Sequence, residues 1–191
     1  MGATAVPLYE KNWVPISHNG SLYMAVELRP LIVCRVHFAT GRCVVEHATP
    51  GLTSDLPPTP ADAMVLEEWI VSGGSPTVLV ESAKHGRYYL GVAHQRQQLP
   101  NTDWGVYVHW AYALAAEPPF GARAMSKPLP LKGHCHRNDG PTALVGGSHI
   151  SFAAGLVVDG DRVVVTYGSG DDMAYVHEAS LAAWEAEMFG G

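Results

Sequence analysis

Charged side chains are scarce in this chain. Lys, Arg, Asp and Glu together make up 16% of its 191 residues, and the formal net charge is −6. So few charges are untypical of long solvated helices and of disordered segments. The acidic balance argues against non-specific nucleic-acid binding, which needs a basic surface to displace counterions. We therefore expect no nucleic-acid partner.

Long apolar runs are also missing. No segment of the sequence approaches the roughly 20 apolar residues that a membrane-spanning helix requires. Residues 1–7 have neither a basic start nor a long apolar core, so we expect no signal peptide. The sequence thus favours a protein with no membrane association.

Cysteine is rare, and the three cysteines, Cys34, Cys43 and Cys135, lack the spacing of a metal or disulfide motif. We expect three free thiols and a reducing, cytoplasmic compartment. A second interpretation stays open, in which Cys34 and Cys43 face each other across a hairpin.

The segment "GHCHRNDG", residues 133–140, brings together several residue types that bind metals. His134, Cys135 and His136 are adjacent, and adjacent side chains of an extended segment point in opposite directions. A tetrahedral zinc site needs four converging groups, and no second paired motif is present. We expect a loop here, no metal site, and no cofactor.

Glycine and turn signals are abundant. The chain has 20 glycines and 14 prolines scattered among 47% apolar residues, as in proteins built from many short strands. Three turn pairs, Asn19-Gly20, His85-Gly86 and Asp159-Gly160, each lie between two apolar runs. Because Asn-Gly and Asp-Gly favour positive φ angles, we expect a hairpin at each pair.

Each hairpin is followed by further strand-like sequence, so the chain reads as repeated four-stranded meanders. Such meanders predict propeller blades at about residues 9–48, 74–130 and 148–180 within a single domain, 1–191. A β-sandwich with three hairpins is the alternative. Ser180 is placed to cap a closing helix at 180–189.

Three motifs together carry a family resemblance. They are "EKNWVPI" at 10–16, "GGSPTVLVE" at 73–81 and "FAAGLVVDGDRVVVTYGSGD" at 152–171. Their order resembles the later blades of five-bladed propellers of the glycoside hydrolase family 130 type, which includes mannoside phosphorylases and related mannosyltransferases. The resemblance implies an all-β, β-propeller-like fold of about three four-stranded blades of an incomplete five-bladed propeller, with a short C-terminal helix. Ser75 and Ala153-Ala154 depart from the family's usual Thr and Pro-Cys.

The resemblance implies a carbohydrate-active protein that acts on mannosides or similar sugars as a glycoside phosphorylase, glycosyltransferase or glycosidase. Its ligand would then be a sugar or sugar phosphate. The family's general-acid Asp lies in an earlier blade that has no match here, so the catalytic residue is unknown. The alternative is a non-catalytic propeller fragment that binds a glycan or a protein. Open sheet edges would call for a homo-oligomer or a partner chain.

Four residues beside these motifs are candidates for substrate or anion binding, each with a structural alternative. The resemblance assigns phosphate or another polar substrate group to Lys11, which is otherwise a surface lysine. It favours Asp171 as an acceptor for sugar hydroxyls; otherwise "GSGDD" is a solvated turn. His94 ends an apolar run and could donate to a hydroxyl or an anion, or simply cap its strand. His149 is a weaker candidate before the third motif.

Overall fold

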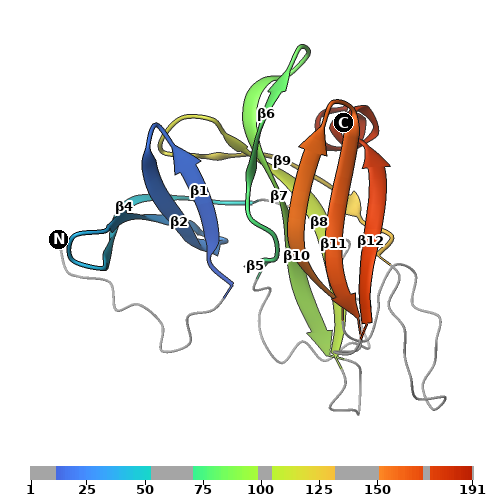
Figure 1. Ribbon diagram of the computed structural model, residues 1–191, viewed down its shortest axis with the longest axis horizontal. Coiled ribbons are helices and arrows are strands. Elements are labelled where there is room, and N and C mark those ends of the chain that lie inside the picture. Colours follow the sequence, from blue (N-terminus) through green and yellow to red (C-terminus); the bar gives the residue numbers. More distant parts are fainter. Residues whose placement is uncertain (1–11, 53–70, 99–104, 132–150, 170–172, 191) are drawn as a thin grey trace.

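The computed structural model describes residues 12–52, 71–98, 105–131, 151–169 and 173–190. Within them the chain forms three antiparallel sheets and one short helix, so the all-β prediction is confirmed. Figure 1 shows the three sheets side by side, with the second between the other two. The described residues contain no helix that is long and apolar enough to cross a membrane.

The first sheet is a meander in which each strand pairs with the next one along the chain. Its strands are β1 (Val14–His18), β2 (Ser21–Leu28), β3 (Leu31–His37) and β4 (Arg42–Thr49). The turn between β1 and β2 is Asn19-Gly20, as predicted, with φ of 46° and 73°. Positive φ at both central residues is the requirement of a type I′ turn.

The second sheet lies in the middle of the molecule. Its strands are β5 (Ser72–Gly73), β6 (Val78–Ser82), β7 (Gly86–Gln98), β8 (Gly105–Ala115) and β9 (Ala122–Pro128). Both β5 and β6 pair with β7, one after the other, so they form a single edge strand interrupted at residues 74–77. The sheet is therefore a four-stranded meander in its outline. Its hairpin turn is residues 83–85, and Gly86 already pairs with Ser82, so the expected two-residue His-Gly turn is wrong.

The third sheet consists, in its described part, of β10 (Ser151–Asp159), β11 (Arg162–Ser169) and β12 (Met173–Ser180). Asp159 pairs with Arg162, so the central turn residues are Gly160 and Asp161, one position later than predicted. Gly160 has a φ of 59° and takes the first central position, which is where a type II′ turn needs glycine.

Burial shows how the sheets pack. Residues 88–95 of β7 are buried without interruption, whereas the outer sheets bury alternate residues. A strand buried at every position is covered on both faces, and an alternating strand on one. Tyr88, Leu90 and Val92 face a core shared with β10 and β11, while Tyr89 and Ala93 face a core shared with β1 to β3. This face-to-face stacking of successive meanders is the arrangement of propeller blades.

The helix α1 (Leu181–Phe189) closes the described chain. Ser180 is its N-cap, and the Ser180 hydroxyl accepts a hydrogen bond of 3.2 Å from the Ala183 N–H. Trp184 and Met188 are buried against the core between the second and third sheets. The capped closing helix predicted from the sequence is confirmed.

Cys34 and Cys43 form a disulfide, which corrects the expectation of three free thiols. The two residues lie on the neighbouring strands β3 and β4, with 5.4 Å between their Cα atoms. The second interpretation, in which they face each other across a hairpin, is the right one. The expectation of a reducing compartment was drawn from free thiols, and the disulfide removes that basis. Cys135 lies outside the described residues.

Candidate functional site

The "GGSPT" motif lies where the three sheets come together. A Cβ atom at Gly73 would come within 2.6 Å of the Asn12 carbonyl oxygen, and it would overlap the side chain of Val14 in the first sheet. At Gly74 it would lie 3.1 Å from the carbonyl oxygen of Ala153 in the third sheet. The glycines therefore allow the inner strands β1, β5 and β10 to approach one another, which is visible in Figure 1.

The two hydroxyl residues of the motif hold this junction together. The Val92 N–H donates a hydrogen bond of 2.9 Å to the Ser75 hydroxyl, and the Thr77 hydroxyl donates one of 2.8 Å to the Pro15 carbonyl. The motif thus ties β1 to β7. Both side chains act on the backbone of this chain, so they position the inner strands.

A polar zone begins beyond this junction, on the face of the second sheet that meets the third. His94 of β7 and His109 of β8 are direct cross-strand partners, and both are buried. By strand alternation they share a face with Val92 and Ala111, which belong to the core between the two sheets. The His94 ring centroid lies 4.9 Å from that of Phe152 and 5.9 Å from that of His109.

The third sheet contributes serines to the same zone. Ser151 and Ser169 are paired across β10 and β11, and both side chains are fully buried. They share a face with Ala153 and Tyr167, which lie in the core against β7 and β8. The interface between the second and third sheets is therefore aliphatic and aromatic along most of its length. It becomes polar at the end where β10 begins and β11 ends.

The His109 side chain in this zone is uncharged at neutral pH. Burial and, to a lesser extent, the nearby His94 lower the pKa of His109 to about 3. At neutral pH its imidazole is uncharged, with one nitrogen that donates and one that accepts. The described buried polar residues of the chain are all His, Ser or Gln, and none is a carboxylate. The zone can exchange hydrogen bonds with a neutral polar group, but its described part offers no carboxylic acid for proton transfer.

Of the four predicted site residues, the structure describes one. His94 lies in the polar zone, between Phe152 and His109. Lys11, His149 and Asp171 lie outside the described residues. In the sequence, Lys11 is one position before Asn12, His149 is two positions before Ser151 at the start of β10, and Asp171 is two positions after Ser169 at the end of β11.

Sequence reasoning missed His109, Ser151 and Ser169. His109 interrupts the apolar run of β8, and that interruption is the one local signal it leaves. Its importance depends on pairing with His94 and on the third sheet packing above it. Neither relationship can be read from a single stretch of sequence.

A second polar cluster lies between the first and second sheets, further toward the start of β7. The Tyr89 hydroxyl donates to the Ser17 carbonyl at 2.6 Å, so the contact of 3.3 Å between this hydroxyl and His18 Nδ1 requires the imidazole to donate. The other nitrogen, Nε2, can then accept from Asn19 Nδ2 at 3.0 Å, and Glu117 lies 3.3 Å from it. Tyr89, His18 and Asn19 satisfy one another, so we interpret the cluster as structural.

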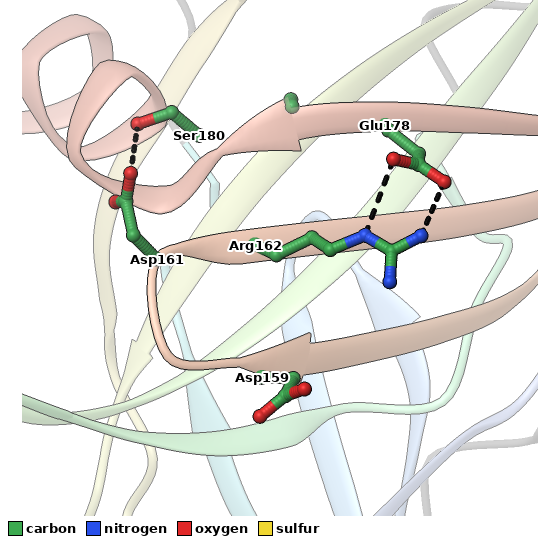
Figure 2. Close-up of a pocket in the computed structure, with 6 residues that line it drawn as sticks. Asp159, Asp161, Arg162, Glu178 and Ser180 are labelled. Carbon is green, nitrogen blue, oxygen red and sulfur yellow. Dashed lines mark hydrogen bonds and ion pairs between the residues drawn. The ribbon is translucent and has the colours of Figure 1, made fainter.

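An open surface hollow lies at the other end of the third sheet, around Asp159, Asp161 and Arg162 (Figure 2). The Ser180 hydroxyl and the Ala182 N–H each donate to the Asp161 carboxylate at 2.8 Å, and these bonds lower its pKa. Arg162 donates through two nitrogens to the Glu178 carboxylate. These charges serve the start of the helix and the pairing of β11 with β12, so the hollow is a weaker candidate than the polar zone.

No protein-family model matches the sequence, and no curated protein matches it. Among solved structures, the chain is similar to a β-1,2-mannobiose phosphorylase from Listeria innocua in complex with β-1,2-mannobiose, with a TM-score of 0.60 and 15% identity. The match covers 97% of this chain and 48% of the phosphorylase, so this chain spans about half of that protein's length. At this identity the likeness shows a shared propeller-type fold.

Proposed function

We propose that this chain is a carbohydrate-active propeller protein that binds mannosides or similar sugars. The observation that carries the proposal is the buried polar zone at one end of the inner strands. It occurs in a chain that shares its fold with a mannoside phosphorylase. Sugar sites combine apolar and aromatic walls with a few placed polar groups, and the surroundings of His94 have this composition.

Lys11, His149 and Asp171 complete the proposed site around His94. The support is their position in the sequence near the starts of β1 and β10 and the end of β11. A carboxylate such as Asp171 would accept charge-assisted hydrogen bonds from sugar hydroxyls. A lysine such as Lys11 would suit a phosphate or another anionic group.

Phosphorolysis is the reaction that the fold likeness favours. Phosphate oxygen would form a bond to the anomeric carbon while the glycosidic C–O bond breaks, and the leaving oxygen would take a proton from an acid. Hydrolysis and transfer to a sugar acceptor differ in the nucleophile. All three need a proton donor, and no residue of this chain is assigned that role.

Glycan binding without catalysis is the second candidate function. It is favoured by the absence of any carboxylate among the described buried polar residues. One experiment distinguishes the two functions. The chain is incubated with β-1,2-mannobiose and inorganic phosphate, and the formation of mannose 1-phosphate is followed. Turnover would support the enzyme, whereas calorimetric binding without turnover would support the glycan-binding protein.

The site assignment is tested with Asp171→Asn and the neighbouring control Asp172→Asn. If Asp171 accepts sugar hydroxyls, its amide variant weakens binding of mannose or β-1,2-mannobiose by roughly 10-fold or more, because a charged acceptor is lost. The control should keep wild-type affinity. If both variants bind with the same affinity as the wild type, Asp171 does not bind the sugar, and "GSGDD" is better interpreted as a solvated turn.

We also propose that a second copy of this chain covers the outer faces of the terminal sheets. Val157 and Val176 of the third sheet are each 59% exposed, and Val45 of the first is 50% exposed. Exposed aliphatic side chains on a sheet are typical of interaction surfaces. Light scattering during gel filtration would show a dimer that Val157→Lys with Val176→Lys converts to a monomer. A monomeric wild-type chain, or association only with a different protein, would contradict the dimer.

A further inference from the structure

Two fully buried polar atoms in the polar zone have no hydrogen-bond partner in the structure. They are the hydroxyl oxygen of Ser151 and Nε2 of His109, and their side chains are 0% and 1% exposed. Ser151 belongs to β10 and His109 to β8, so the two atoms lie on facing sheets of one interface. The unpartnered buried groups of Gln95 and Tyr112 lie on the opposite face of the second sheet.

An unpartnered polar group inside a protein is costly, by roughly 1–3 kcal/mol. Alanine or valine would fill the position of Ser151 without that cost, as Ala153 does two residues later on the same face. Buried polar atoms without partners therefore need a reason, such as a bound water or a bound ligand. Because two such atoms face one interface, we interpret them as groups that bind the same ligand.

The interface between them is lined by rings and small polar side chains. The His94 ring lies beside His109 and packs against Phe152. Ser169 is the cross-strand partner of Ser151. A hydroxyl donates and accepts hydrogen bonds, and so do the serine hydroxyl and a neutral imidazole. A ligand hydroxyl, the serine hydroxyl and the neutral imidazole can therefore hydrogen-bond one another, and none of the three carries a charge.

We infer that Ser151 and His109 hydrogen-bond a hydroxyl group of a neutral sugar, and that they are specificity-determining residues of the site proposed above. The inference rests on the proposed function, because it concerns the same ligand class. The low pKa of His109 is consistent with it, since a neutral imidazole has no preference for an anion. The sugar hydroxyl would supply the partner that both atoms lack in the free protein.

The test uses Ser151→Ala with Ser126→Ala as its matched control. Ser126 is a second buried serine, but its hydroxyl is satisfied within the chain. It accepts from the Ala111 N–H at 3.0 Å and donates to the Lys127 carbonyl at 2.6 Å. Affinity for mannose and β-1,2-mannobiose is measured by calorimetry, and the melting temperature of each free variant is recorded.

The inference expects opposite results from the two variants. Ser151→Ala should weaken sugar binding about 10-fold and leave the melting temperature unchanged or higher, because it removes a group with no partner. Ser126→Ala should lower the melting temperature and leave the affinity unchanged. His109→Phe, which keeps a ring of similar shape, should behave like Ser151→Ala.

Two results would overturn the inference. If Ser151→Ala lowers the melting temperature and keeps sugar affinity, a structural water holds the two groups. If inorganic phosphate binds at Ser151 in competition with the sugar, the group that enters is an anion. A wild-type chain that binds no sugar at all would instead refute the proposed function, and this inference with it.

Discussion

Gly91 of β7 lies directly opposite Tyr112 of β8, and the tyrosine ring occupies the space that a side chain at position 91 would need. A Cβ atom there would come within 2.5 Å of the hydroxyl oxygen and 2.8 Å of a ring carbon. Both residues are buried in the central sheet, where the first sheet covers Tyr112. The glycine therefore makes room for the ring.

Gly91→Ala should destabilise the protein. The added methyl group forces a buried ring away from its position between two sheets, and overpacking of this kind costs about 1–3 kcal/mol. Urea denaturation measures the change in the free energy of unfolding. Gly121→Ala is the control, because Gly121 has no atom within 4 Å of its would-be Cβ and no positive φ. Equal stability of the two variants would contradict this packing.

Tyr112→Phe should leave stability unchanged or raise it. The Tyr112 hydroxyl is buried without a hydrogen-bond partner, so its removal loses no bond and relieves an unsatisfied group. Tyr88→Phe is the matched contrast, since the Tyr88 hydroxyl donates a hydrogen bond of 2.8 Å to Glu185 of the helix. That variant should lose about 1 kcal/mol in the same denaturation experiment. A loss for Tyr112→Phe as large as for Tyr88→Phe would show that the hydroxyl of Tyr112 is partnered.

Local turn chemistry explains how much of the fold the sequence predicts. Asn19-Gly20 forms the expected turn because both residues tolerate positive φ. At the third hairpin the same reasoning misplaces the turn by one residue, because Gly160 can serve either position. In the observed register Val163 pairs with Val158, and Val165 pairs with Leu156 in the core. A turn one residue earlier would pair Val163 with Leu156 and bury the same faces, so the alternation of apolar residues does not distinguish the two turns.

The site was harder to predict because its residues meet across strands and sheets that are distant in the sequence. His94 stands out because it ends an apolar run, and the structure places it in the polar zone. His109 and Ser151 gain their interest from a cross-strand partner and a facing sheet, which are contacts between distant parts of the chain. The disulfide also depends on how two strands pair. Cys34 pairs with Val45 and Cys43 with Val36, and a register shift in the pairing of β3 with β4 lies next to Cys34.

Reduction of the disulfide between Cys34 and Cys43 should lower stability by about 2–3 kcal/mol, as expected when a bond that closes a loop of about ten residues is lost. Thiol titration of the denatured, unreduced protein should count one thiol, that of Cys135, and three after reduction. Three thiols before reduction would contradict the disulfide. Cys34→Ala with Cys43→Ala should make stability insensitive to reductant.

Acid should destabilise the protein through His109. Its pKa in the folded protein is about 3, and its ordinary value is 6.5. Well above pH 6.5 the imidazole is neutral in both states, so its contribution to stability is complete. As the pH falls from about 6.5 toward 3, the unfolded chain takes up a proton that the folded protein refuses. The free energy of unfolding should then fall by up to about 1.4 kcal/mol per pH unit.

His109→Phe separates this effect from other titrating groups. Hydrogen bonds from Ala182 and Ser180 also lower the pKa of Asp161, and the hydrogen bond from Arg162 lowers that of Glu178. Protonation of these carboxylates in acid therefore destabilises the protein too. Their losses begin below about pH 5, near the ordinary carboxyl pKa, and they are present in wild type and variant alike. Between pH 6.5 and 5 the wild type should therefore lose more stability than His109→Phe. Any steric cost of the phenyl ring is independent of pH and leaves the slope unaffected. Parallel slopes for the two proteins in urea denaturation across this range would show that His109 takes up its proton in the folded state, and hence that water or an acidic partner reaches it.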